Sequence, residues 1–147
     1  MRRLLYILLF VLGTLVTSCD KVPVNGKLDG MWQLMEIVTP AGITDVKPHK
    51  TYISFQLNLS EWQKGGIIYY AHFGRTGDYL LFYDMYSPAK SSDTNYDDHR
   101  VIQEDIDRGA LEPWGIYSLN PAFLILELTG SNMTLLGGDA MLKFRKF

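Results

Sequence analysis

Residues 123–147, FLILELTGSNMTLLGGDAMLKFRKF, contain three apolar segments separated by two short polar stretches. The apolar segments are Phe123–Leu128, Met133–Leu136 and Ala140–Phe147. The polar stretches are Gly130-Ser131-Asn132 and Gly137-Gly138-Asp139. Glycine, asparagine, serine and aspartate favour tight turns, because glycine tolerates positive φ angles and the short polar side chains hydrogen-bond to nearby backbone. The stretch therefore predicts a three-stranded antiparallel meander at the end of the chain.

The same pattern extends back toward the middle of the chain. Tyr52–Leu59 alternates apolar and polar residues, which is typical of a strand with one buried face. Ile67–Phe73 and Tyr79–Tyr86 are apolar on both faces, and Gly74–Asp78 between them suits a hairpin loop. We expect these two segments to pair as antiparallel neighbours.

The region from Gly30 onward is rich in aromatic and β-branched residues with glycines at short intervals, which predicts short strands joined by turns. One short amphipathic helix is predicted within Ile102–Leu111. The chain is therefore expected to be all-β and to fold as one domain. We predict an up-and-down antiparallel β-barrel of about eight strands, since closure removes exposed sheet edges. A β-sandwich is the alternative.

The N-terminus has the features of an export signal. Arg2 and Arg3 precede Leu4–Val16, an uncharged segment that is short for a membrane span. Cys19, the single cysteine of the chain, follows directly, so no disulfide can form within one molecule. Residues 1–18 are accordingly predicted to be a signal peptide that is removed.

The order Val16-Thr17-Ser18-Cys19 resembles the lipobox of bacterial lipoproteins. Asp20–Leu28 contains proline, asparagine, glycine and alternating charges without an apolar period, so we predict a tether over residues 19–28 and a folded domain over residues 29–147. The resemblance implies lipidation of Cys19. It also implies a cell-envelope protein of a Gram-negative bacterium, anchored by its lipid to the outer membrane or to the periplasmic face of the inner membrane. The alternative is an ordinary signal peptide that happens to be followed by a cysteine.

Gly30-Met31-Trp32 and Phe144-Arg145-Lys146 lie at the two ends of the predicted domain. They are similar to the G-x-W of lipocalins and to the basic residue on the last lipocalin strand. The whole region resembles the small lipocalin-like lipoproteins of gut anaerobes. The resemblance implies that Gly30, Trp32 and Arg145 close one barrel end, with Arg145 in a cation–π contact with the indole. Lys143 or Lys146 could replace Arg145, and Trp32 could also be a core residue without such a contact.

Aromatic side chains are concentrated on the two central strands of the predicted barrel, more than one buried face requires. We predict that Tyr69, Phe73, Phe82 and Tyr86 line a cavity for a small apolar or amphipathic ligand. Alternation leaves the choice between Tyr69 and Tyr70 open, and also that between Phe82 and Tyr83. A filled barrel is the other reading, since eight strands enclose either packed side chains or one small ligand. The function would then be that of an envelope interaction module that binds a protein or a glycan through exposed aromatics.

Other functions find little support in the sequence. The acidic series from Asp93 to Glu104 resembles a calcium loop, but Asp98 replaces the required glycine. The three histidines are far apart, so no metal site is predicted. No catalytic constellation or cofactor motif is present, and a non-enzymatic protein is expected. With 16 acidic against 14 basic residues, binding to nucleic acid is not expected.

Overall fold

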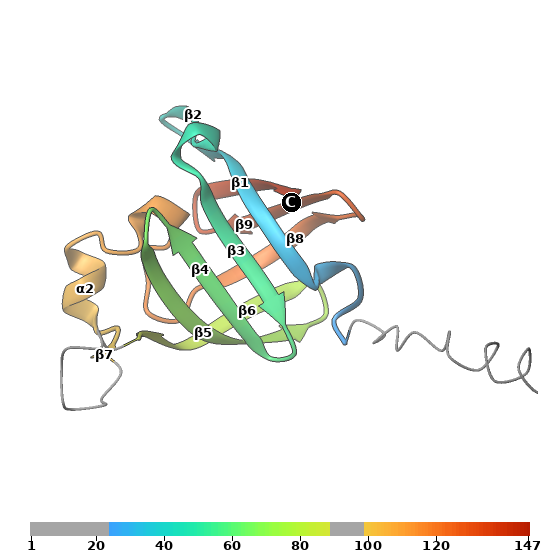
Figure 1. The fold of residues 1–147 in the computed structure, drawn as a ribbon. Coiled ribbons are helices and arrows are strands. Elements are labelled where there is room, and N and C mark those ends of the chain that lie inside the picture. Colours follow the sequence, from blue (N-terminus) through green and yellow to red (C-terminus); the bar gives the residue numbers. More distant parts are fainter. Residues whose placement is uncertain (1–23, 89–98) are drawn as a thin grey trace, which may run out of the picture.

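The computed structural model describes residues 24–88 and 99–147, which form a β-barrel with a few short helices (Figure 1). The strands are β1 (Gly30–Thr39), β2 (Gly42–Asp45), β3 (Thr51–Gln56), β4 (Leu59–Lys64), β5 (Ile67–Thr76), β6 (Tyr79–Ser87), β7 (His99–Arg100), β8 (Ala122–Leu128), β9 (Asn132–Gly137) and β10 (Ala140–Lys146). The helices are the α-helix α2 (Gln103–Asp107) and three 3₁₀ helices, η1 (Gly26–Leu28), η2 (Lys47–His49) and η3 (Glu112–Trp114).

The strands β1, β3, β4, β5, β6, β8, β9 and β10 pair in this order, and β10 returns to β1. This pairing closes an eight-stranded antiparallel barrel within the described residues. The predicted up-and-down barrel is therefore confirmed, and the β-sandwich alternative is wrong. The predicted C-terminal meander is also present, as β8, β9 and β10. Outside the ring, β2 pairs with β1 and β7 with β6.

The antiparallel pairing places the connections at two opposite ends of the barrel. One end, here called the Trp32 end, carries η1, the β3–β4, β5–β6 and β8–β9 turns, and the chain terminus after β10. The other, here called the helix end, carries α2, η3 and the β9–β10 turn. Buried side chains from α2 and η3, Ile106 and Trp114, belong to the same core as the strands. The barrel is therefore covered at its helix end.

Side chains fill the interior between the two ends. The largest fully buried ones are Trp32, Trp62, Trp114, Phe55, Phe82 and Phe123. The Phe82 ring contacts three of them: it lies edge-to-face against Trp62 and Phe123, with ring centroids 4.8 Å and 5.9 Å apart, and 6.1 Å from Phe55. Edge-to-face aromatic packing of this kind stabilises a core beyond the area it buries. Burial of the large aromatics thus explains how a single domain of this size acquires a continuous core.

Three predicted elements differ from the structure. The hairpin loop predicted over Gly74–Asp78 is shorter, because β5 continues to Thr76 and only Gly77 and Asp78 form the turn. Tyr52–Leu59 is not one strand: β3 ends at Gln56, the chain turns at Leu57, and β4 starts at Leu59. Leu57 takes a left-handed backbone conformation with φ of 55°, which an apolar β-strand pattern does not predict. The helix predicted within Ile102–Leu111 is present but shorter, as α2.

The Trp32 end is closed by a lysine instead of the predicted Arg145. Trp32 is fully buried, and its indole Nε1 donates a hydrogen bond to the Leu28 carbonyl at 2.8 Å. The Lys146 Nζ lies 4.8 Å from the Trp32 ring centroid and donates to the carbonyls of Lys27 and Asp29. Arg145 is exposed, because neighbouring residues of a strand point to opposite faces.

Gly30 has a structural role at this end. Its φ of 109° is rarely adopted by other residues, and a Cβ there would lie 3.1 Å from the Lys146 Cε. Leu28 is 1% exposed and joins the core. The folded domain therefore includes Leu28, which the sequence assigned to the tether, and it starts before the predicted residue 29.

Candidate functional site

The aromatic residues predicted to bind a ligand do not line a common cavity. Phe73 and Phe82 are buried members of the core, with ring centroids 6.4 Å apart. Tyr69 faces inward but is half-buried, and its ring lies 5.8 Å from that of Trp114. Burial raises the pKa of the Tyr69 hydroxyl, and the negative charge of Asp105 raises it further. These three side chains belong to the packed interior.

Tyr86 lies on the outer face of the barrel. A β-bulge in β6 places three residue steps, from Tyr83 to Tyr86, opposite two steps on β5. Asp84 is left in a left-handed conformation with φ of 51°. The bulge reverses the alternation after Phe82, so Met85 points inward and Tyr86 outward. The prediction that Tyr86 shares a face with Phe82 is therefore wrong.

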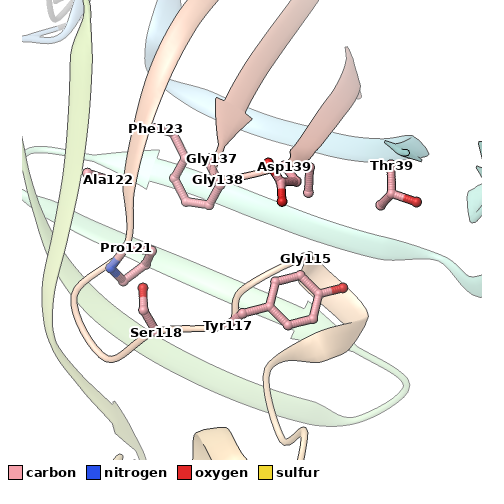
Figure 2. A pocket seen from close by; sticks show the side chains of 11 residues that line it. Thr39, Gly115, Tyr117, Ser118, Pro121, Ala122, Phe123, Gly137, Gly138 and Asp139 are labelled. Carbon is pink, nitrogen blue, oxygen red and sulfur yellow. The ribbon is translucent and has the colours of Figure 1, made fainter. Parts of the chain in front are cut away.

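A pocket of about 450 Å³ lies at the helix end instead (Figure 2). This volume is within the range of about 300–1,000 Å³ that is common for small-molecule sites. The end of β1, the segment that follows η3, the start of β8 and the β9–β10 turn surround it. Four strands of the barrel, β1, β8, β9 and β10, and the segment after η3 therefore meet at one site.

Two glycines allow the close packing that shapes this pocket. A Cβ at Gly137 would lie 2.5 Å from the Phe123 ring, so only glycine permits the ring to lie against β9. Gly115 has a φ of 70°, and a Cβ there would lie 2.5 Å from Leu142. Gly115 thus lets the segment after η3 approach the barrel. Both glycines line the pocket, and Phe123 is the largest apolar side chain in its wall.

The pocket combines an apolar wall with polar groups. Phe123, Pro121 and Ala140 are buried residues of the wall. Figure 2 shows the side chains of Thr39, Ser118, Tyr117 and Asp139 around it. Tyr117 is 58% exposed, so it lies where the pocket meets solvent. Among the lining residues, Asp139 alone is charged. This arrangement suits a molecule with an apolar body and a polar head.

No sequence pattern marks this pocket, because its lining combines strand ends with turn and irregular residues from distant segments. Gly137, Gly138 and Asp139 were predicted as a tight turn; the β9–β10 turn is present but consists of Gly138 and Asp139, since β9 extends to Gly137. The segment from Gly115 to Pro121 has neither strand nor helix periodicity. Paired glycines in a turn leave space for a neighbouring ring, and this was the single local signal available.

A closed eight-stranded up-and-down barrel with a pocket at one end defines a lipocalin-type protein. Residues 14–147 match the family model of the lipocalin-like domain. The chain belongs to this family, as the G-x-W motif predicts. No curated protein matches the chain.

Three solved structures share the fold. A lipocalin-like protein from Bacteroides uniformis has a TM-score of 0.58 and 17% sequence identity, over 83% of this chain and 100% of its own. An uncharacterized protein from Bacteroides eggerthii has a TM-score of 0.57 and 20% identity, over 82% and 99% of the two chains. A protein from Burkholderia xenovorans has a TM-score of 0.52 and 13% identity, over 82% and 83%. At these identities the likeness concerns the fold.

Some predicted features lie outside the described residues. They are the signal peptide, Cys19 and the acidic residues Asp93–Asp98. Within residues 24–88 and 99–147, no cluster of three metal-ligating side chains is found. The longest helix in these residues is α2, with five residues, so no described helix spans a bilayer.

Proposed function

We propose that this chain is a non-enzymatic, lipid-anchored protein of the cell envelope that binds a small amphipathic molecule in the helix-end pocket. The observation that carries the proposal is the pocket itself, which is the roomy apolar site that the filled barrel interior does not provide. Membership of the lipocalin-like family is consistent with small-ligand binding. The proposed binding site therefore lies at the end of the barrel, and not in the barrel interior as predicted from the sequence.

The lining of the pocket indicates the chemistry of the ligand. Phe123 and Pro121 are already buried, so affinity would come from the ligand's own apolar surface, at about 25 cal/mol per Å² removed from water. The head group would meet the hydroxyls of Thr39 and Ser118 and the Asp139 carboxylate. A carboxylate accepts hydrogen bonds and repels anions. A neutral or cationic head is therefore favoured over the carboxylate of a fatty acid.

Filling the pocket should weaken ligand binding. Ser118 is exposed and lines the pocket, so Ser118→Trp should occupy it without disturbing the core. For a chain that begins at Asp20, we expect the affinity for the neutral fluorophore N-phenyl-1-naphthylamine to fall by about tenfold or more, equivalent to about 1.4 kcal/mol. Fluorescence titration measures this affinity.

The matched control is Ser131→Trp, which places the same side chain in the exposed β8–β9 turn at the opposite end. Its affinity should equal that of the unmodified chain. Displacement by dodecylamine should exceed displacement by laurate, and Asp139→Asn should reduce this difference. If the fluorophore does not bind, or if both tryptophan variants behave alike, the pocket is not the site.

The lipid anchor is tested at Cys19. The proposal rests on Arg2 and Arg3, the apolar segment after them and the lipobox-like Val16-Thr17-Ser18-Cys19. Cys19→Ala should prevent acylation and leave either unprocessed precursor or an unanchored form. Metabolic labelling with a palmitate analogue, followed by membrane fractionation, measures this. Absence of label on the unmodified protein, with a mature N-terminus other than Cys19, would contradict the proposal.

A further inference from the structure

The outer surface of the barrel carries a second hollow, which includes the β3–β4 turn at the Trp32 end. It lies over β3, the β3–β4 turn, β4 and β5, and its volume is about 470 Å³. The residues whose side chains matter here are Ser54, Gln56, Leu57, Asn58, Glu61 and Tyr70. We call it the outer groove. Its strands lie next to one another in Figure 1.

The β3–β4 turn forms one wall of the outer groove, and two of its backbone carbonyls accept hydrogen bonds from other segments. The Leu57 carbonyl accepts a hydrogen bond from the Asn25 Nδ2 at 2.8 Å. The Asn58 carbonyl accepts one from the Phe73 backbone N–H at 3.0 Å. These bonds tie the turn to the N-terminal segment and to β5. The wall is therefore ordered before any ligand binds, which lowers the entropic cost of binding.

Leu57 is an unusual residue for this turn. It has a positive φ, and its side chain is 61% exposed. Glycine or asparagine would adopt this conformation at lower cost, and a branched apolar side chain gains nothing from burial there. A leucine in this conformation, at the edge of a hollow, is an outlier that suggests contact with another molecule.

The opposite part of the outer groove is a row of paired residues across the sheet. Register pairs Ser54 with Glu61, Glu61 with Tyr70, and Tyr70 with Tyr86. Burial raises the pKa of the Tyr70 hydroxyl, and the negative charge of the neighbouring Glu61 carboxylate raises it further. The Tyr86 ring supports Tyr70 from the next strand, with centroids 5.7 Å apart. The tyrosine ring and the carboxylate are thus cross-strand neighbours on the outer face of the sheet.

We propose that the outer groove binds a neutral saccharide. A sugar ring presents C–H groups on its faces and hydroxyls around its edge. The C–H groups can pack against the Tyr70 ring and the Leu57 side chain, because the face of an aromatic ring is electron-rich. The hydroxyls can pair with the Gln56 and Asn58 amides, which both donate and accept, and with the Glu61 carboxylate, which accepts.

Charge distinguishes a neutral saccharide from other ligands. Glu61 is the single charged side chain among the residues that line the outer groove, so sulfated or uronic saccharides would be repelled. Four lining residues carry polar side-chain groups besides Tyr70, namely Ser54, Gln56, Asn58 and Glu61. A purely apolar ligand would leave these groups unpaired, at a cost for each. The site is separate from the helix-end pocket, and the proposal does not rest on the proposed function.

The test is titration of the full chain, kept in a detergent without sugar such as lauryldimethylamine oxide, with defined oligosaccharides. The neutral probes are malto-, xylo- and manno-oligosaccharides, and the anionic probe is oligogalacturonate. We expect at least one neutral series to bind and oligogalacturonate not to bind. Amide chemical-shift changes in the unmodified protein should map to Leu57–Glu61 and Tyr70. This mapping needs no variant, so it holds even where a variant folds poorly.

Variants locate the site independently. Tyr70→Ala should lower saccharide affinity by about tenfold or more, as expected for loss of a central aromatic contact. Leu57→Gly should also weaken binding, while the melting temperature stays the same or rises. Tyr79→Ala is the matched control, because Tyr79 is an exposed tyrosine of β6 outside the outer groove. Its affinity should be unchanged, as should that of Ser118→Trp.

Three results would overturn the proposal. They are failure of every neutral saccharide to bind at millimolar concentration, shifts that map away from the outer groove, and equal binding of oligogalacturonate. Retention of binding by Ser118→Trp, which fills only the helix-end pocket, separates the two proposals: either site can fail while the other stands.

Discussion

Replacing Trp32 with alanine should lower the free energy of unfolding by about 3–5 kcal/mol, the usual cost of truncating a large buried aromatic side chain. Trp32 is fully buried in the core at the closed end of the barrel. The substitution also removes the hydrogen bond from Nε1 to the Leu28 carbonyl. Because β1 pairs with both β3 and β10, loss of this side chain loosens the point where the barrel closes. Urea denaturation followed by fluorescence or circular dichroism measures the change.

A double-mutant cycle identifies the cation that acts on Trp32. Lys146→Ala should couple to Trp32→Ala by about 0.5–2 kcal/mol, because the two side chains share a cation–π contact. Arg145→Ala is the control from the next position of the same strand, and its coupling to Trp32→Ala should be close to zero. Coupling to Arg145 with none to Lys146 would restore the assignment that the sequence suggested. The measurement therefore decides between two neighbouring basic residues.

Much of the barrel could be predicted because its signals are local. The turns of the C-terminal meander combine glycine with small polar residues, and the strands between them are apolar. A few adjacent residues therefore predict each strand boundary. Closure of the ring follows from the number of strands and from the cost of exposed edges. The G-x-W motif added the family. Trp32 was accordingly placed correctly at a barrel end.

Local sequence patterns could not predict which basic residue contacts the Trp32 indole. Arg145 and Lys146 are adjacent and both basic, so composition cannot distinguish them. What decides is the phase of β10, in which Leu142 and Phe144 point inward and Lys146 reaches the carbonyls at the end of the barrel. One residue of register reverses which side chain meets the indole.

The candidate site was predictable only in part, because long-range packing decides which side chains line a pocket. Tyr69, Phe73 and Phe82 were expected to face inward, and they do so, but they pack against one another and against tryptophans whose packing the sequence did not reveal. The outward turn of Tyr86 depends on the bulge at Asp84, and no residue pattern in β6 marks it. The helix-end pocket depends on contacts between distant segments, such as Gly115 with Leu142. Such long-range packing leaves no periodicity in the chain.

Phe82→Ala should be comparably destabilising, by about 3–5 kcal/mol, because it removes the ring at the centre of the interior. Phe82 is 1% exposed, and its ring contacts those of Phe55, Trp62, Phe73 and Phe123. Tyr86→Ala is the control from the same strand: it is half-buried on the outer face, so its cost should be well below that of Phe82→Ala. Chemical denaturation of the two variants measures the difference.

Binding measurements on the Phe82→Ala variant show whether Phe82 is a core residue or a residue that contacts the ligand. If Phe82 belongs to a filled core, a folded Phe82→Ala protein should still bind the neutral fluorophore at the helix-end pocket. Its affinity should fall only to the extent that Phe123, which contacts Phe82 and lines the pocket, is displaced. A cavity of the size of the lost ring is apolar and dry, and such cavities admit small apolar molecules such as benzene or xenon. The variant should therefore gain a new internal xenon site, detectable by xenon-induced chemical-shift changes near Trp62. If the unmodified protein already binds xenon there, or if Phe82→Ala costs no more than Tyr86→Ala, the interior is an open ligand cavity and the filled-barrel description fails.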